Sequence, residues 1–409
     1  MLPVAQAETI ILDRVQSLDS RQDVETIDLG ASLNRILAIP VVSALDFPHW
    51  DNSAMDGYAV RFADVETVPV TLAIVEEIPA GYQPQMALQK GQAARIFTGA
   101  ILPQGADTVI MQENTEREGE RVKILQSPQP QEFVRHRAAF YEAGTPLLPP
   151  GIKIGAAEMA VLAAAQCTEV TVYRQPRVAL FSTGDELVSA DKPLQPGQIV
   201  DSNQYALAAF VTQMGGISVP LGIVRDREDK LEEAIARAVK TADVVLSTGG
   251  VSVGEYDLVG KILQKLGGEI QIRKVAIKPG KPLTVATFPG TKSAKPCLYF
   301  GIPGNPVSAL VSCWRFVQPA LKKLSGLKGN WQPNFVTAKT VHSLKGAGQR
   351  DAYLWGKLRL EKGQYQFELA GGSHSSGNLI NLAQTNGLAI VPAGVQGVNA
   401  GEIVTVMQV

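Results

Sequence analysis

Three Gly-rich, polar segments follow short apolar runs in the middle of this chain, and their residue types suit an anionic, phosphorylated ligand. The apolar runs have the composition of buried β-strands. The runs and the segments that follow them are 176–181 with 182–186, 243–247 with 248–257, and 297–300 with 301–306. In an open α/β sheet, ligands bind outside the carboxyl ends of the strands. We therefore expect these segments to meet at one edge of a sheet and to form a ligand site.

Carboxylates follow several of the predicted strands. Glu186, Asp226 and Asp257 each occupy such a position. Carboxylate oxygens near a phosphate usually hold Mg²⁺ or position a water molecule. Taken singly, Asp226 and Asp257 are also good helix caps, because a helical pattern follows each of them. Their combination at one predicted edge favours a metal site.

The segment from Thr248 to Gly254 could hold a phosphate with its backbone N–H groups, and it contains Gly249, Gly250 and Ser252. A tight structural turn is an equal alternative for this segment alone. It fits neither the Walker A pattern nor the dinucleotide-binding fingerprint.

A basic turn, Lys278-Pro-Gly-Lys281-Pro282, follows the apolar residues 275–277. Proline stiffens the backbone, and an ammonium group is a compact point charge that suits oxyanions. A solvated surface turn is the usual alternative for such a lysine pair. The apolar residues before the turn favour binding, because they anchor it to a core.

The elements that must position these segments alternate between strand and helix from residue 173 to residue 328. Helices are predicted at 204–214, 228–241, 258–266 and 306–324. The last helix has Asn305 as its N-cap and Pro306 at its first position. Alternation of this kind predicts a parallel sheet with right-handed crossovers, which is a central doubly wound α/β domain.

The flanking regions are predicted to be β-rich. Short β patterns separated by turn residues predict a small β-rich domain at 51–140, in which Asp56-Gly57 signals a turn. Short strands near the C-terminus predict a small barrel or sandwich at 329–409. Residues 1–50 and 141–172, with a Pro/Gly-rich connection, are assigned to an N-terminal helical and extended linker domain.

Composition restricts the class of protein. A formal net charge of −1 disfavours sequence-independent nucleic-acid binding, and 45% hydrophobic residues indicate a folded protein. The cysteines Cys167, Cys297 and Cys313 form no Cys-x-x-Cys pair, so zinc-ribbon and thioredoxin sites are excluded. No signal peptide or membrane-length apolar run is visible. We expect a cytoplasmic protein with neither nucleic-acid nor membrane partners.

Seven motifs, in order along the chain, resemble the MoeA-type molybdopterin molybdenumtransferases, the family of the gephyrin E domain. The motifs lie at residues 51–60, 97–100, 181–187, 247–254, 277–282, 301–308 and 372–374. Each motif alone is weak, but the ordered set covers nearly the whole chain and is very specific.

The resemblance implies an enzyme that inserts molybdate into adenylated molybdopterin, releases AMP and yields molybdenum cofactor, with Mg²⁺ assisting. It also implies an elongated homodimer of four-domain subunits, with an α/β domain like that of the MogA and MoaB proteins. The implied active site lies at the dimer interface, where Asp56 and Thr98 reach across from the second subunit. Molybdopterin adenylyltransferase and molybdoenzyme apoproteins are the implied partners.

The resemblance also assigns roles to individual positions. The implied Mg²⁺ ligands are Glu186, Asp226 and Asp257. The implied anion-binding positions are Lys274, Lys278, Lys281, Pro282, Ser308, Ser373 and Arg350. These assignments are chemically consistent, because lysines offset the charges of phosphate and molybdate while carboxylates hold the metal.

Two departures from the family pattern leave an alternative open. The family's Arg-x-x-Gly-Glu-Asp motif reads here Arg135-His-Arg-Ala-Ala-Phe140, and the motif that begins at Arg350 lacks its last arginine. A missing carboxylate would weaken Mg²⁺ handling, so a non-catalytic molybdopterin-binding or scaffold protein is the alternative. A phosphate-binding enzyme unrelated to molybdenum would explain the central segments, but not the motifs in the terminal regions.

Overall fold

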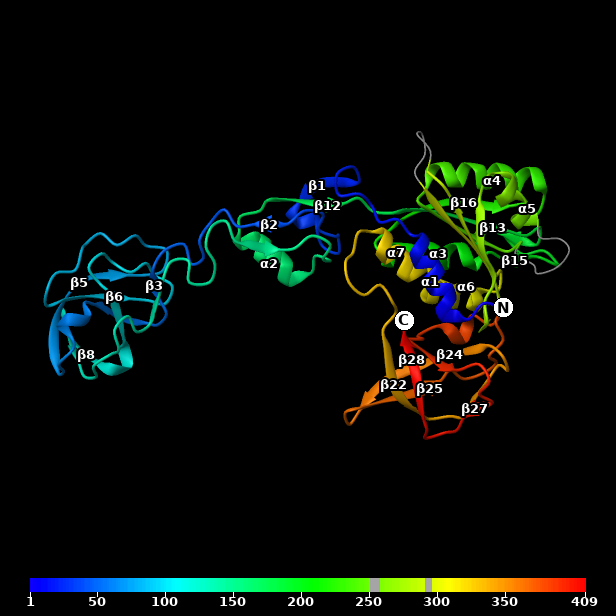
Figure 1. The fold of residues 1–409 in the computed structure, drawn as a ribbon. Helices are drawn as coiled ribbons and strands as arrows, with labels where there is room; N and C mark the ends of the chain where they lie inside the picture. The colour runs from blue at the N-terminus through cyan, green and yellow to red at the C-terminus, as the bar shows by residue number, and fades with distance from the viewer. Residues whose placement is uncertain (251–257, 291–295) are drawn as a thin grey trace. The chain divides into compact units, whose positions relative to one another are not determined.

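The computed structural model describes residues 1–250, 258–290 and 296–409. The chain forms two units. One unit contains residues 1–39, 150–156 and 169–409, and the other contains residues 40–149 and 157–168. Their elements are labelled in Figure 1. The finer division into four domains stays a prediction.

The first unit contains the predicted α/β domain, built on a six-stranded sheet of order β16-β13-β17-β21-β20-β18. The strands are β13 (Arg177–Thr183), β16 (Ile217–Val224), β17 (Val244–Thr248), β18 (Glu269–Lys274), β20 (Pro282–Phe288) and β21 (Cys297–Ile302). Neighbours among β16, β13, β17 and β21 pair in parallel, as predicted. The sheet departs from the predicted parallel pairing at β20, which pairs antiparallel with both β21 and β18. The connection from β18 to β20 contains no helix, so it cannot make the crossover that parallel pairing requires.

Helices cover both faces of this sheet (Figure 1). They are α1 (Val4–Arg14), α3 (Ser202–Gln213), α4 (Glu228–Thr241), α5 (Leu258–Lys265), α6 (Pro306–Ser312) and α7 (Gln318–Leu324). Alternate strand residues point to opposite faces. Leu180 of β13 packs in the core with α1, α3, α6 and α7, and Phe181 packs with α4 and α5. The doubly wound prediction is therefore confirmed.

The predicted helix over residues 306–324 is interrupted by a π-helical turn at Cys313–Val317. Pro319 lacks an N–H group, and its ring would clash with the carbonyl four residues earlier in a regular α-helix. Arg315, inside this turn, is buried, and its guanidinium group binds the Glu8 carboxylate, with an Nη2–Oε2 distance of 3.0 Å. Asn305 occupies the N-cap position of α6, but its side chain makes no capping hydrogen bond.

The C-terminal part of the first unit is a closed barrel, which settles the choice between barrel and sandwich. Its strands are β22 (Phe335–Thr340), β24 (Asp351–Glu361), β25 (Gln364–Leu369), β26 (Gly387–Val391) and β28 (Ile403–Gln408). They pair in the order β24-β25-β22-β28-β26, and β26 pairs with β24 to close the ring. The short strand β19 (Ile277–Lys278) leaves the α/β domain and pairs with the start of β24.

The second unit is β-rich, as predicted, with a six-stranded sheet of order β7-β4-β6-β5-β9-β8. Its strands are β4 (Gly57–Val60), β5 (Val70–Ile78), β6 (Gln92–Ile96), β7 (Thr108–Met111), β8 (Thr115–Glu118) and β9 (Arg121–Ile124). The polar residues before β4 concealed this strand from sequence reasoning, although all four of its residues are buried. Gly57 is required there, because a Cβ atom would lie 1.8 Å from the Ile110 carbonyl oxygen.

Short elements complete the two units. They are β1 (Val24–Asp28) with β12 (Glu169–Tyr173), β2 (Val41–Val42) with β11 (Pro146–Leu148), β3 (Asn52–Ser53) with β10 (Val134–Arg135), β14 (Leu187–Val188) with β15 (Ile199–Val200), and α2 (Ala156–Ala164). Among the residues that the structure describes, no helix is long and apolar enough to cross a membrane.

Cys297 and Cys313 are free and buried, and burial raises the pKa of both thiols.

Candidate functional site

The loops after β13, β17 and β21 meet at the carboxyl edge of the sheet, which we call the rim. The Gly249 N–H group donates to the Ile302 carbonyl oxygen at 3.3 Å. A Cβ atom on Gly249 would lie 2.2 Å from the Thr183 carbonyl oxygen, so only glycine fits at this crossing. Gly304 is also close, since a Cβ atom there would lie 3.6 Å from the Gly249 Cα.

Two of the three predicted carboxylates lie at the end of β13. The Glu186 carboxylate folds over Gly184, where an added Cβ would lie 2.7 Å from the Glu186 Oε2 atom. Asp226 Oδ1 accepts a hydrogen bond from the Thr183 hydroxyl group. Asp257 and Ser252 lie outside the described residues. Within the described ranges no group of three or more His, Cys, Asp or Glu side chains could hold a metal ion.

The predicted basic residues surround the turn between β18 and β20. Lys274 ends β18 and pairs in register with Pro282, and the Val275 N–H group donates to the Lys281 carbonyl oxygen at 3.0 Å. Lys274 and Lys278 are exposed and Lys281 is half-buried. None of these three ammonium groups has a carboxylate partner among the residues described.

The lysine turn packs against the first turns of α6. A Cβ atom on Gly280 would lie 3.1 Å from the Ser312 hydroxyl oxygen and 3.8 Å from the Ser308 carbonyl oxygen. Ser308 is 4% exposed. Arg350 lies beside the same turn, because the next residue, Asp351, pairs in register with Ile277.

The predicted Ser373 belongs to an exposed loop of the barrel that also reaches α6. The Val307 N–H group donates to the Ser376 carbonyl oxygen of this loop at 3.2 Å. Asn381 Nδ2 holds the loop by donating to the Ser373 carbonyl oxygen at 2.9 Å. The barrel loop therefore contacts the beginning of α6, and the lysine turn packs against the same helix at Ser308 and Ser312.

Asp56 and Thr98 form a pair in the second unit. Asp56 Oδ1 accepts from the Thr98 backbone N–H group and from its hydroxyl group, each at 2.7 Å. These hydrogen bonds, the side-chain one first, lower the pKa of the Asp56 carboxyl. The pair fixes a charged carboxylate at the turn before β4, and its role in a shared active site stays a prediction.

The segment around Phe140 is folded without the family's carboxylates. Phe140 is 64% exposed, and its ring centroid lies 5.7 Å from that of Phe47. Asp46 organises the neighbouring backbone by accepting from the Ala143 N–H group at 2.8 Å and from Arg137. The Ala143 bond first, and then Arg137, lower the pKa of Asp46.

Sequence reasoning missed Asp201 and Asn203, at the start of α3. Asp201 Oδ1 accepts from the Gln204 N–H group at 3.2 Å and so caps the helix. Asn203 Nδ2 donates to the Gly304 carbonyl oxygen at 2.7 Å, which ties α3 to the rim. The sequence Asp-Ser-Asn directly before a helical pattern is an N-cap signal that could have identified them.

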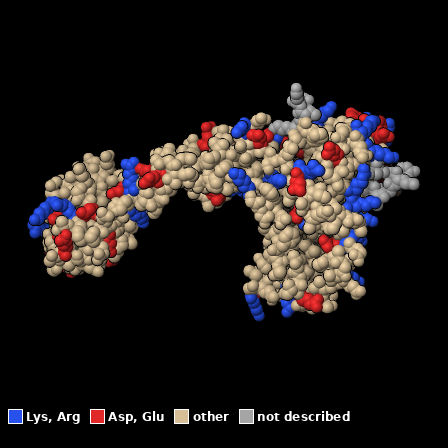
Figure 2. All heavy atoms as spheres, in the orientation of Figure 1, with Lys and Arg blue, Asp and Glu red and all other residues tan. Residues whose placement is uncertain are grey.

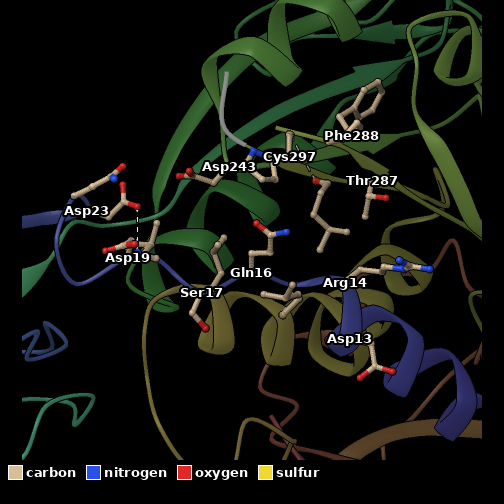
Figure 3. Close-up of a pocket in the computed structure, with 18 of the residues that line it drawn as sticks. Asp13, Arg14, Gln16, Ser17, Asp19, Asp23, Asp243, Thr287, Phe288 and Cys297 are labelled. Atoms are coloured by element: carbon tan, nitrogen blue, oxygen red, sulfur yellow. Dashed lines mark hydrogen bonds between the residues drawn. The ribbon is translucent and has the colours of Figure 1, made fainter. Parts of the chain in front are cut away.

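A cavity of about 520 Å³ lies at the other edge of the sheet, near the amino ends of β13, β17 and β21. Figure 3 shows Asp243, Cys297, Thr287 and Phe288 among the residues that line it. None of the predicted site residues lines this cavity. Figure 2 shows acidic and basic side chains interspersed on the visible face, in keeping with the small net charge.

Three family models match the chain. Residues 2–165 match the MoeA N-terminal region (domain I and II), residues 179–323 match the probable molybdopterin binding domain, and residues 337–409 match the MoeA C-terminal region (domain IV). Together they cover most of the chain, in the order in which the sequence motifs occur.

Relatives and solved structures agree along the full length. A molybdopterin molybdenumtransferase of Nostoc sp. is 58% identical, over 100% of this chain and 94% of the relative. The Haemophilus influenzae molybdopterin molybdenumtransferase is 36% identical, over 99% of this chain and 98% of the relative. A crystal structure of the molybdopterin biosynthesis MoeA protein from Pyrococcus horikoshii is 27% identical, with a TM-score of 0.83 and complete coverage of both chains. The chain therefore belongs to the MoeA family.

Proposed function

We propose that this protein is a molybdopterin molybdenumtransferase, an enzyme of molybdenum cofactor biosynthesis that inserts molybdate into adenylated molybdopterin and releases AMP. The observation that carries the proposal is the 58% identity to the Nostoc transferase over the whole of this chain. The scaffold alternative is not favoured, because such similarity covers the rim as well as the terminal regions. This alternative rests on Phe140 alone, so it would require that a substitution in one loop abolishes the activity.

The reacting groups are all anionic, and the rim carries cations that have no carboxylate partner among the described residues. Lys274, Lys278 and Lys281 would offset the charges of molybdate and of the phosphate groups, as ammonium groups do for oxyanions. Arg350 and Ser308 flank the same turn, with Pro282 and the Ser373 loop completing its surroundings. The glycines Gly249 and Gly250, together with Ser252, would hold a phosphate through the backbone.

The carboxylates at the end of β13 suit Mg²⁺. Glu186 and Asp226 both lie beside Thr183 and supply hard oxygen donors, which Mg²⁺ prefers, and Asp257 would complete the set. When bound there, Mg²⁺ would neutralise charge at the phosphate that AMP carries away. The residues of this chain would hold the metal and orient the phosphate.

The proposal includes a homodimer in which Asp56 and Thr98 contribute a fixed carboxylate to the site of the partner subunit. It also includes a cytoplasmic location, with molybdopterin adenylyltransferase supplying the substrate and molybdoenzyme apoproteins accepting the product. Its support is the ordered set of motifs that resembles the family, in which both Asp56 and Thr98 are retained.

AMP release by the purified protein tests the proposed function. Adenylated molybdopterin is supplied with and without molybdate and Mg²⁺, and AMP is quantified. We expect release that requires molybdate and is stimulated by Mg²⁺. Tight binding of the substrate without release would contradict the proposal and favour the scaffold alternative. Phe140→Asp would then test whether the missing carboxylate restores activity.

A further inference from the structure

A second cavity, of about 350 Å³, adjoins the rim beside the predicted metal carboxylates. It is lined by Leu187 and Val188 of β14, by Ser189 and Lys192 after that strand, by Gly222 and Ile223 of β16, and by Asp201, Gln204 and Tyr205 at the beginning of α3. Glu186 directly precedes this lining, and Asp226 follows it by three residues. Asn203 joins the same end of α3 to the Gly304 carbonyl oxygen of the rim. The cavity is therefore an extension of the proposed active site.

One end of this cavity carries two polar side chains whose hydrogen bonding is incomplete. Asp201 is 4% exposed, and Oδ1 caps α3 while Oδ2 has no partner among the residues described. Gln204 Nε2 is also buried without a partner in the described chain. Buried polar groups are nearly always paired, because leaving one unpaired costs free energy. A donor placed in the cavity would satisfy Asp201 Oδ2, and an acceptor would satisfy Gln204 Nε2.

The rest of the cavity suits a flat ring. Tyr205 lies next to Gln204 and is 60% exposed, so its ring is free to stack. Gly222 has a φ of 83°, and a Cβ atom there would meet no heavy atom within 4 Å. The register of β13 and β16 shifts at this point, with Phe181 opposite Gly222 and Leu180 opposite Pro220. Such irregularities often occur next to binding sites.

We propose that this cavity binds the pterin ring of the substrate, with Asp201 and Gln204 reading its pyrimidinone edge. The edge carries two adjacent N–H donors, from the 2-amino group and N3, that suit the Asp201 carboxylate. The neighbouring C4 carbonyl oxygen accepts from Gln204, and Tyr205 stacks on the ring. Adenine suits the site less well, because its amino group is flanked by two ring nitrogens that would repel a carboxylate. This assignment rests on the proposed function, whose substrate is a pterin.

The test measures the binding of 6-hydroxymethylpterin and of AMP to the full-length protein by fluorescence and calorimetry. Asp201→Asn keeps the helix cap, since Asn caps as well as Asp, but replaces the acceptor with an amide. We expect pterin affinity to fall about 10-fold to 100-fold, the range for one hydrogen bond to a charged group, with AMP affinity unchanged. Asp28→Asn is the matched control, because Asp28 is exposed and does not line the cavity.

A second variant, Tyr205→Ala, tests the cavity without changing the Asp201 cap of α3. Tyr205→Ala removes an exposed ring, so the fold should be retained, and we expect pterin affinity to fall about 10-fold, as for loss of one stacking contact. Unchanged pterin affinity in both variants would overturn the proposal. Loss of AMP affinity in place of pterin affinity would also overturn it, by assigning the cavity to adenine. Absence of pterin binding to the unmodified protein would also overturn the proposal, since buried water would then be the partner of Asp201 and Gln204.

The outcome is separable from that of the proposed function. Molybdate-dependent AMP release together with unchanged pterin affinity in Asp201→Asn would reject this inference and leave the transferase assignment intact. Pterin binding that depends on Asp201, without AMP release, would reject the transferase assignment and leave the pterin site intact.

Discussion

The two edges of the α/β sheet use charge in opposite ways. At the amino ends of the strands, Arg174 binds Asp243 through two hydrogen bonds of 2.7 Å and Asp23 through one of 2.8 Å. The bond to Asp243, followed by that to Asp23, raises the pKa of the Arg174 guanidinium against the effect of burial. At the rim, the three lysines around the turn before β20 have no carboxylate partner in the described chain. The first edge pairs its charges internally, whereas the lysines of the other edge are unpaired within the described residues, as the proposed anion site requires.

The largest expected effect is a loss of stability when the ion pairs at the amino edge of the sheet are broken. Arg174→Ala leaves Asp23 and Asp243, whose side chains are 8% and 10% exposed, without their cation. Removal of one partner of a buried pair costs about 3–5 kcal/mol, so we expect the free energy of unfolding in urea to fall by that amount. Arg177→Ala, at an exposed neighbouring position, is the control and should cost less than about 1 kcal/mol. Equal losses in the two variants would contradict the distinction between the edges.

The next effect concerns catalysis at the rim. Glu186→Gln keeps the size of the side chain and removes its charge, so we expect AMP release to fall about 100-fold to 1000-fold, as when one electrostatic contact to a transition state is lost. Stability should change by no more than about 0.5 kcal/mol, because the side chain is partly exposed. Asp185→Asn, at the exposed neighbouring residue, should retain activity. Normal turnover by Glu186→Gln would remove this carboxylate from the proposed metal site.

A smaller effect is expected for a single rim cation. Lys278→Ala should weaken molybdate binding about 10-fold to 100-fold, because a charge-assisted hydrogen bond contributes about 1.5–3 kcal/mol. The affinity lost should be smaller at high salt, since screening already weakens the contact. Lys265→Ala is the control: its ammonium group pairs with Glu232 on the surface at 2.6 Å, and its loss should leave molybdate affinity unchanged. Equal effects of both substitutions would indicate general electrostatics in place of a site.

The smallest expected effect is a change in the pKa of Asp56 in the second unit, where the Thr98 hydroxyl and backbone N–H groups donate to this carboxylate. Because the Thr98 hydrogen bonds lower the pKa of Asp56 below the reference value of 3.8, their contribution to stability is complete above pH 3.8 and is lost as pH falls through the folded-state pKa. Thr98→Val removes the hydroxyl donor and should raise the Asp56 pKa, as measured by NMR titration of the carboxyl carbon. An unchanged pKa would show that the backbone N–H group alone sets it.

The fold was largely predictable from pattern. Helix α4 begins and ends where its amphipathic spacing predicts, and the parallel strands follow from alternation with helices. The antiparallel direction of β20 was missed because this strand was not predicted, although the connection from Lys274 to Pro282 is too short for a parallel crossover. Strand β4 was missed because its flanking polar residues read as a loop.

The site was predictable where loops follow strands, because strand order places their ends together. The pairing of Glu8 with Arg315 joins residues that are 307 positions apart, and no local signal reports it. Asp201 was overlooked for a different reason. Its sequence context is fully explained by helix capping, and only the structure shows that its second oxygen has no hydrogen-bond partner among the residues described.

The π-helical turn at Cys313–Val317 has a consequence for how this segment can evolve. Each residue of an α-helix advances the side-chain direction by about 100°, so a turn with an additional residue offsets the angular phase of everything after it. Helix α6 faces the lysine turn through Ser308 and Ser312, whereas α7 packs against α1. Helices α6 and α7 are therefore constrained by different contacts.

Deletion of one residue from this turn would rotate α7 out of register by about 100°, and Pro319 would still prevent a regular helix. Buried Leu321 and Ala320 would then turn away from the core that they share with α1. Point substitutions at exposed positions should be tolerated on either half, but a change in length should be eliminated. The number of residues in the segment is therefore constrained in addition to the identity of buried residues such as Ser308 and Leu321.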